Sequence, residues 1–214
     1  MNNVLLDPLP TDWESPDGHV YPLDTDFRIG IQLCLVQDDI ELSEREKIIQ
    51  MQKLLFVGYV PPNPKEVEEC LKFFLNGWHH DNSGRKKEKK RLMDFDIDQW
   101  RIYSAFLAQY HIDLNTVPYM HFWMFMGLLS SLQECSYTRV IDIRQRKFKP
   151  KMSAEEKKQL REAKDIYELP ELISLEDQEM EADISDFLGG TISEAEKKRV
   201  EEFEKYADIE EGDE

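Results

Sequence analysis

The chain has 214 residues, of which 41% are hydrophobic and 33% charged, and its formal net charge is −17. This length suits one domain with a hydrophobic core plus appendages, and the high charge with scarce glycine favours a soluble, helix-rich fold. The N-terminus lacks the basic and apolar segments of a signal peptide, and the longest apolar run, around 120–132, is too short to span a bilayer. We therefore expect no membrane partner.

The negative charge is concentrated near the C-terminus. Residues 1–164 contain 25 acids and 23 bases, whereas residues 165–214 contain 19 acids and 4 bases. An acidic segment disfavours nucleic-acid binding, which relies on cationic contacts with phosphate. Two interpretations stay open: a solvated, partly disordered tail without a specific partner, or a tail that keeps a partner soluble or docks on a basic one.

Helical periodicity and capping signals predict an all-α protein, organised as a compact multi-helix domain with a central antiparallel helical hairpin and an acidic C-terminal extension. Residues 1–22, rich in proline and aspartate, predict an extended N-terminal arm. The predicted starts of the next helices are Asp24 or Thr25, Ser43 in a capping box with Glu46, and Asn63 paired with Glu66.

The stretch 98–132 is the most informative segment. It predicts two strongly apolar helices joined by a short polar connector, with the second starting at Thr116 and Pro118 in its first turn. The second helix carries apolar residues on nearly all of its faces, which implies that most of its surface is buried. The short connector between the two helices predicts that they form the antiparallel hairpin. The apolar face of the first helix is predicted to consist of Tyr103, Phe106, Leu107 and Tyr110.

Beyond the hairpin, the cluster from Arg139 to Lys151 predicts a helix packed on the core with its basic groups outward, which would also offer the acidic tail an intramolecular contact. Ser153 with Glu156 predicts a charged helix to about Tyr167, and Ser193 begins a last weak helix. The predicted organisation is an arm at 1–22, a helical core domain at 23–168 and an acidic, partly disordered or weakly helical tail at 169–214.

No residue constellation predicts an enzyme, a cofactor or a metal centre. Phosphate-loop, nucleophile-elbow and zinc-protease motifs are all missing from the sequence. His111 and His121 flank the predicted turn but lack a third ligand, and the alternating Asp94, Asp96 and Asp98 are better explained by helix capping than by a calcium loop. The widely spaced Cys34, Cys70 and Cys135 predict buried free thiols.

The basic run at 85–91 invites comparison with a nucleic-acid patch. It lies between two predicted helices in an acidic protein, so we interpret it as a solvated loop.

Several motifs resemble one known family. They are Tyr21-Pro-Leu-Asp-Thr-Asp-Phe-Arg28, Tyr103-Ser-Ala-Phe106, Gln109-Tyr-His-Ile-Asp-Leu114, Met120-His-Phe-Trp123 and Val140-Ile-Asp-Ile-Arg144. Together they resemble the "gene product fifteen" family of siphophages and related prophages, over roughly residues 15–170. Where the family pattern has two consecutive tryptophans after the histidine, this chain has Phe122-Trp123.

The resemblance implies a phage tail assembly chaperone that binds and solubilises the tape measure protein, with the tail tube protein as a further candidate partner. It implies action in the host cytoplasm during assembly and absence from the mature virion. The alternative is a structural subunit of the tail or its connector. We predict partner binding at Phe122, Trp123, Phe125 and Met126, because Trp and Met suit adaptable interfaces; core packing of the same residues is the competing interpretation.

Overall fold

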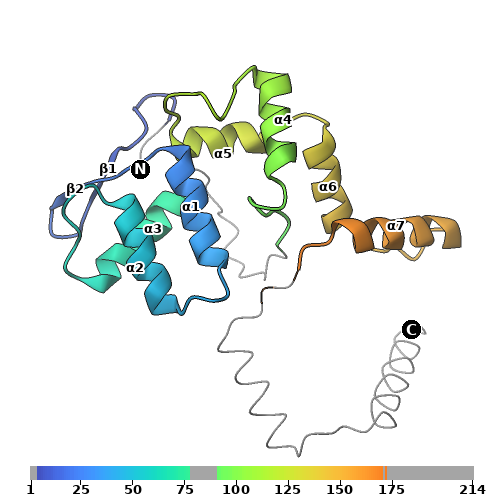
Figure 1. The fold of residues 1–214 in the computed structure, drawn as a ribbon, viewed down its shortest axis with the longest axis horizontal. Helices are drawn as coiled ribbons and strands as arrows, with labels where there is room; N and C mark the ends of the chain where they lie inside the picture. Colours follow the sequence, from blue (N-terminus) through green and yellow to red (C-terminus); the bar gives the residue numbers. More distant parts are fainter. Residues whose placement is uncertain (1–3, 78–90, 171, 173–214) are drawn as a thin grey trace, which may run out of the picture. The chain divides into compact units, whose positions relative to one another are not determined.

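The computed structural model of the protein describes residues 4–77, 91–170 and 172, which belong to one compact unit. These residues form a mostly helical fold with seven α-helices and one small sheet (Figure 1). The basic run at 85–90, the weak helix at Ser193 and the acidic tail beyond 172 lie outside the described residues. The elements are β1 (Asp12–Glu14), β2 (Val20–Pro22), α1 (Phe27–Asp38), α2 (Glu44–Leu55), α3 (Pro64–Asn76), α4 (Gln99–Tyr110), α5 (Phe122–Ser130), α6 (Ser136–Gln145) and α7 (Ala154–Tyr167).

The N-terminal segment corrects the all-α prediction, because it contains a short β-hairpin. β1 and β2 pair antiparallel with Trp13 opposite Tyr21, and Gly18 adopts a positive φ in the turn between them. Both aromatic side chains are buried in the core, while their strand neighbours are exposed. Strands of three residues are too short for their alternation to be distinguished from a proline-rich extended arm.

The predicted capping signals place three helices correctly. Ser43 and Ser153 each form a capping box with the glutamate three residues later, and they begin α2 and α7. Asn63 caps α3, and its side-chain amide also donates to Glu66. α1 differs from its prediction by a residue or two, because Asp26 is the N-cap and accepts from the backbone N–H of Arg28 at 2.9 Å.

The start of α5 corrects the prediction at Thr116. The residues before α5 pair with the start of α1: the N–H of Phe27 donates to the carbonyl of Met120, and the N–H of Phe122 donates to the carbonyl of Thr25, each at 2.8 Å. These bonds hold the chain extended up to His121, so α5 begins at Phe122. The pairing joins segments almost a hundred residues apart, which no local capping signal reveals.

His121 is the N-cap of α5, and both nitrogens of its ring have partners. Nδ1 accepts from the N–H of Trp123 at 3.0 Å, so the proton lies on Nε2, which donates to the carbonyl of Pro10 at 2.9 Å. Burial lowers the pKa of His121, which favours the neutral form that this arrangement requires. The residue thus fastens the N-terminal segment to the start of α5.

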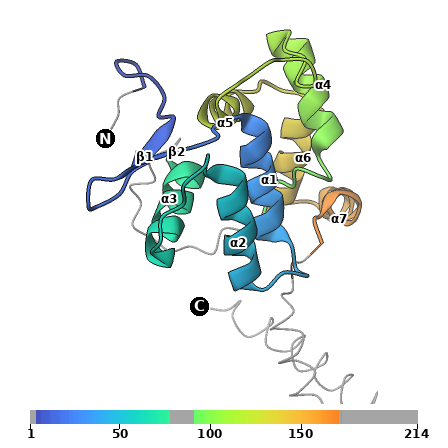
Figure 2. The same ribbon diagram turned by 60° about the vertical axis from the view of Figure 1, so that its left-hand side comes forward.

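The predicted antiparallel hairpin of α4 and α5 is wrong. α5 packs on α1, α4 packs on α6, and α5 runs across α4 instead of beside it (Figures 1 and 2). The connection from residue 111 to 121 is long enough to cross the start of α1, which redirects α5. Leu107 therefore lies on the exposed face of α4, whereas Phe106 is fully buried.

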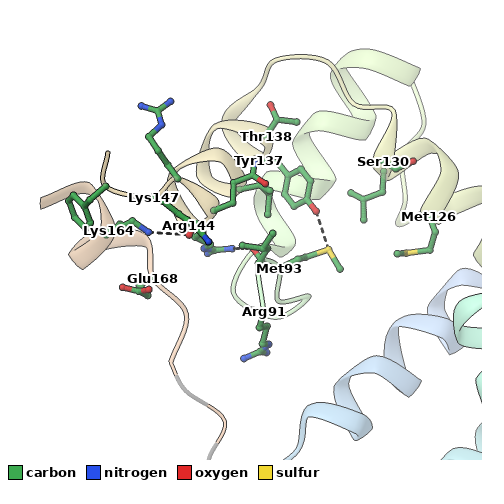
Figure 3. Close-up of a pocket in the computed structure, with 16 residues that line it drawn as sticks. Arg91, Met93, Met126, Ser130, Tyr137, Thr138, Arg144, Lys147, Lys164 and Glu168 are labelled. Atoms are coloured by element: carbon green, nitrogen blue, oxygen red, sulfur yellow. Dashed lines mark hydrogen bonds between the residues drawn. The ribbon is translucent and has the colours of Figure 1, made fainter. Parts of the chain in front are cut away.

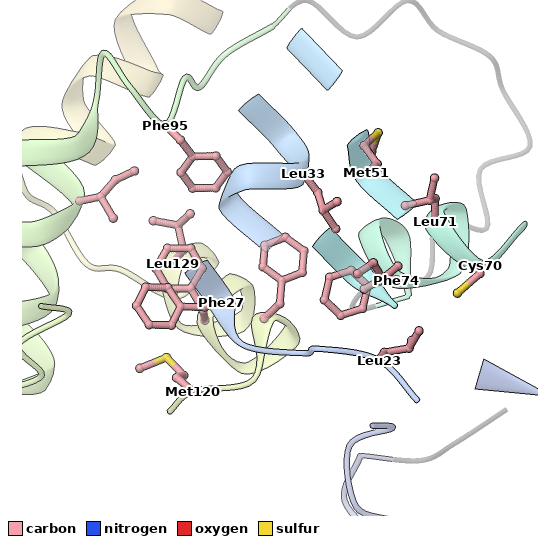
Figure 4. Packing of buried hydrophobic residues seen from close by; sticks show 14 of the residues in the cluster. Leu23, Phe27, Leu33, Met51, Cys70, Leu71, Phe74, Phe95, Met120 and Leu129 are labelled. Carbon is pink, nitrogen blue, oxygen red and sulfur yellow. The ribbon is translucent and has the colours of Figure 1, made fainter. Parts of the chain in front are cut away.

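Aromatic rings of α5 belong to the core, part of which Figure 4 shows around Phe27 and Phe74. Phe125 is fully buried and stacks on Phe27 of α1 and Phe106 of α4, with ring centroids 5.1 Å apart in both pairs. One turn earlier, Phe122 stacks on Phe74 of α3 at 5.3 Å. α5 thereby binds three helices that have few contacts with one another.

Gly30 sets the distance between α1 and α5. A Cβ at this position would lie 2.0 Å from the ring of Phe122, whereas a Cβ at Gly127 of α5 would meet nothing within 4 Å. Because the ring of Phe122 is itself enclosed, we predict that Gly30→Ala lowers the free energy of unfolding by about 1–3 kcal/mol. Gly127→Ala is the matched control, since alanine is the better helix former and should raise it by up to about 1 kcal/mol. Chemical denaturation of both variants measures the difference, and equal stabilities would contradict the close approach.

Candidate partner-binding groove

An open groove of about 1380 Å³ lies between α5, α6, α7 and the segment that precedes α4 (Figure 3). Its volume exceeds the roughly 300–1,000 Å³ of ordinary small-molecule pockets, so it has room for a larger partner. The apolar part of its lining is Leu92, Met93, Met126, Leu129, Tyr137, Ile141 and Phe148. The charged part is Arg91, Arg144, Arg146, Lys147, Lys164 and Glu168.

Two methionines from different elements contribute to the apolar wall of the groove and make it adaptable. Met93 precedes α4 and Met126 belongs to α5, and both are partly buried against the core. The hydroxyl of Tyr137 donates to the sulfur of Met93 at 3.1 Å, and burial raises the Tyr137 pKa to about 12, so this phenol stays protonated. Flexible thioether side chains can repack against partners of different shape.

A buried ion pair forms the base of the groove. The Arg144 guanidinium donates to both carboxylate oxygens of Asp98, at 2.6 and 3.1 Å, and both side chains are at least 97% buried. The same guanidinium donates to the carbonyls of Leu92 and Tyr167, at 2.9 and 2.6 Å. One residue of α6 therefore fixes the segment before α4, the first turn of α4 and the end of α7.

The position of Arg144 corrects the prediction that the basic groups of 139–151 point outward. Arg144 is 3% exposed and points into the fold, while Arg146 and Lys147 are exposed as predicted. Asp98 occupies the N-cap position of α4, as the sequence predicts. It makes no side-chain capping bond, however, because its carboxylate is engaged by Arg144 and by Arg101 at 3.1 Å.

The four residues predicted to bind a partner fall into two groups. Phe122 and Phe125 are 1% and 0% exposed, so they belong to the core, which agrees with the competing interpretation of the pattern. Trp123 is half-buried and its indole N–H donates to the carbonyl of Phe74 at 2.6 Å. Met126 is the member that lines the groove. Partner binding through these residues stays a prediction.

Sequence reasoning missed most of the groove. The sequence predicts that the helix in the cluster from Arg139 to Lys151 packs on the core, but it does not single out Ile141 or Phe148 as groove residues, and it assigns no role to Met93. The one available signal was the hydrophobic pattern inside the cluster from Arg139 to Lys151. Periodicity alone does not reveal that these residues share a surface with α5.

The remaining candidates for chemistry are separated in the fold. His111 is the left-handed C-cap of α4, whereas His121 is buried against Pro10. The sequence places the adjacent His79 and His80 at a predicted helix end, where neighbouring side chains point in different directions and would not easily chelate together, and both lie outside the described residues. No group of three or more His, Cys, Asp or Glu side chains in the described ranges is arranged to hold a metal ion. The three cysteines are free, and burial raises the pKa of the Cys70 thiol to about 12.

The comparisons identify the family of this mostly helical protein, and the family implies a phage protein of the structural or assembly-related class. The family model described as "Bacteriophage Gp15 protein" matches residues 5–169, so the chain belongs to this family. No curated protein and no solved structure matches the chain. Among the described residues, no helix has the length and apolar character needed to cross a membrane.

We predict that Arg144→Ala lowers the free energy of unfolding by about 3–5 kcal/mol, because the buried Asp98 carboxylate loses its bidentate partner and, of its two arginines, keeps only the partly exposed Arg101. Lys147→Ala, three residues on and exposed, is the matched control and should change it by less than about 0.5 kcal/mol. Urea denaturation followed by circular dichroism measures both. A loss below about 1 kcal/mol for Arg144→Ala would show that the ion pair does not hold these segments together.

Proposed function

We propose that this protein is a tail assembly chaperone that binds the tape measure protein and keeps it soluble until the tail tube encloses it. Family membership supports a role in phage structure or assembly. The observation that carries the finer proposal is the open apolar groove with Met93 and Met126 in its lining. A long, helical, sparingly soluble partner is the kind of ligand that such a groove suits.

The mechanism is helix-in-groove binding. An α-helix with its side chains is about 10–12 Å wide, and an amphipathic helix presents apolar residues at three- and four-residue steps. Met126 and Ile141, from α5 and α6, would contact that stripe. Each apolar side chain that becomes fully buried contributes about 1.5–3 kcal/mol, and the methionines allow several different segments of a long partner to bind in turn.

The acidic residues near the C-terminus support the solubilising part of the proposal. Residues 165–214 carry 19 acids and 4 bases. Several copies of the protein on one tape measure chain would give the complex a large net negative charge, which disfavours its association with other complexes.

Co-expression with the tape measure protein encoded beside this chain tests the proposal. We expect the partner to become soluble and to co-purify with the full-length protein. If the partner remains insoluble and does not co-purify, the chaperone function is overturned.

Met126 and Met124 provide a matched pair on one helix, since Met126 lines the groove and Met124 is half-exposed elsewhere on α5. We predict that Met126→Ala weakens binding to the tape measure protein about five- to thirtyfold, with little change in the thermal transition. Met124→Ala should leave the affinity unchanged. Calorimetric titration of each variant with a soluble peptide from the tape measure protein measures both. Equal losses in the two variants would contradict binding in the groove.

A structural subunit of the tail or its connector is the second candidate. The outer face of α4 favours it, because Trp100 is 74% exposed, packs edge-on against Tyr103, and is flanked by the exposed Ile97 and Leu107. Such an apolar face suits a permanent interface. Mass spectrometry of purified particles separates the candidates, because a chaperone should be absent and a structural subunit should be present in fixed copy number.

A further inference from the structure

The charges around the groove are strongly biased. Five of its lining residues are Arg or Lys and one, Glu168, is acidic. The sequence up to residue 164 is not basic as a whole, because it contains 25 acids and 23 bases. Three of the five basic residues of the groove already pair with aspartates: Arg144 with Asp98, Arg146 with Asp142, and Arg91 with Asp38 and Asp94. Lys147 and Lys164 have no carboxylate partner among the described residues, and the apolar wall beside them lowers the local dielectric and strengthens their interaction with a bound charge.

Arg91 supplies an independent observation at one edge of the groove. Its Nη2 pairs with Asp94, and with Asp38 at 3.2 Å. Its Nε and Nη1 are buried and have no hydrogen-bond partner in the part of the chain that the structure describes. Buried donors without acceptors are unfavourable, so this guanidinium gains from any carboxylate brought into the groove toward which it can turn.

We propose that the groove selects a helical protein segment whose apolar stripe is flanked by Glu or Asp. The apolar stripe lies on Met126 and Ile141, one flanking carboxylate pairs with Arg91, and others face Lys147 and Lys164. This inference rests on the proposed function and specifies which segments of the partner bind. It also predicts that an equally apolar but basic segment is rejected by like-charge repulsion.

Three synthetic peptides of about 20 residues, long enough to form a helix, test the selectivity. They share one Leu/Met stripe and differ only in flanking residues, which are Glu, Gln or Lys. Their binding to the full-length protein is measured by fluorescence anisotropy at low and high salt. At low salt we expect the Glu peptide to bind about tenfold more tightly than the Gln peptide, and the Lys peptide to bind most weakly. High salt should reduce the preference for the Glu peptide.

Charge-reversal variants locate the interaction. Lys147→Glu should weaken binding of the Glu peptide about three- to tenfold and strengthen binding of the Lys peptide. Lys158 on α7 does not line the groove, so Lys158→Glu should leave both affinities unchanged. Arg91→Met should weaken the Glu peptide with little effect on the Gln peptide. Because Arg91 also pairs with two aspartates, the thermal transition of the Arg91→Met variant is measured alongside its binding. If this variant is unstable, Lys147→Glu still decides the test.

The outcomes separate this inference from the function on which it rests. Equal affinity for all three peptides overturns charge selection while leaving an apolar groove in place, whereas no binding of any peptide and no co-purification of the tape measure protein overturns both. A Glu preference that survives Lys147→Glu and Arg91→Met shows that the carboxylates bind elsewhere. If light scattering shows a dimer that Lys147→Glu dissociates, the groove is occupied by a second copy of the protein. If the Glu peptide binds only to a chain shortened to end at Leu172, the groove is occupied by the acidic residues of the chain itself. Either result overturns the proposal.

Discussion

The groove depends on the buried ion pair between Arg144 and Asp98. A guanidinium has five N–H donors in a fixed plane, and that of Arg144 donates to the Asp98 carboxylate and to the carbonyls of Leu92 and Tyr167. A lysine at this position could not reach the same acceptors in one geometry. Because those acceptors belong to three different segments, the pair fixes the base of the groove while leaving its apolar wall free to adapt.

The other half of the domain is organised by a different kind of contact. α5 inserts Phe122 and Phe125 among the aromatic rings of α1, α3 and α4, and Gly30 lets the helices approach closely. The same helix then presents Met126 to the groove on its remaining side. α5 thus joins a rigid core face to an adaptable binding face, which reconciles its dense apolar sequence with a role in partner binding.

Local signals predicted much of this fold and little of its groove. The capping pairs at Ser43, Asn63 and Ser153 were confirmed because a cap is decided by residues within one turn. The start of α5 and the predicted hairpin were wrong because pairing between the starts of α1 and α5 overrides the local signal at Thr116. Arg144 was interpreted as a surface residue because composition cannot distinguish a buried, paired arginine from a solvated one in a basic run. The resemblance to the phage family rests on motifs of which one, Val140-Ile-Asp-Ile-Arg144, ends at this buried arginine.

Hydrogen–deuterium exchange of the full-length protein, alone and in complex with the co-expressed tape measure protein, tests the central claim most directly. The account predicts slower exchange on binding in the segments that line the groove, from residue 91 to 93 and from residue 126 to 148, with no change on the outer face of α4. Protection confined to α4 around Trp100, with the groove segments unchanged, would contradict it and would place the partner on the other apolar face of the protein.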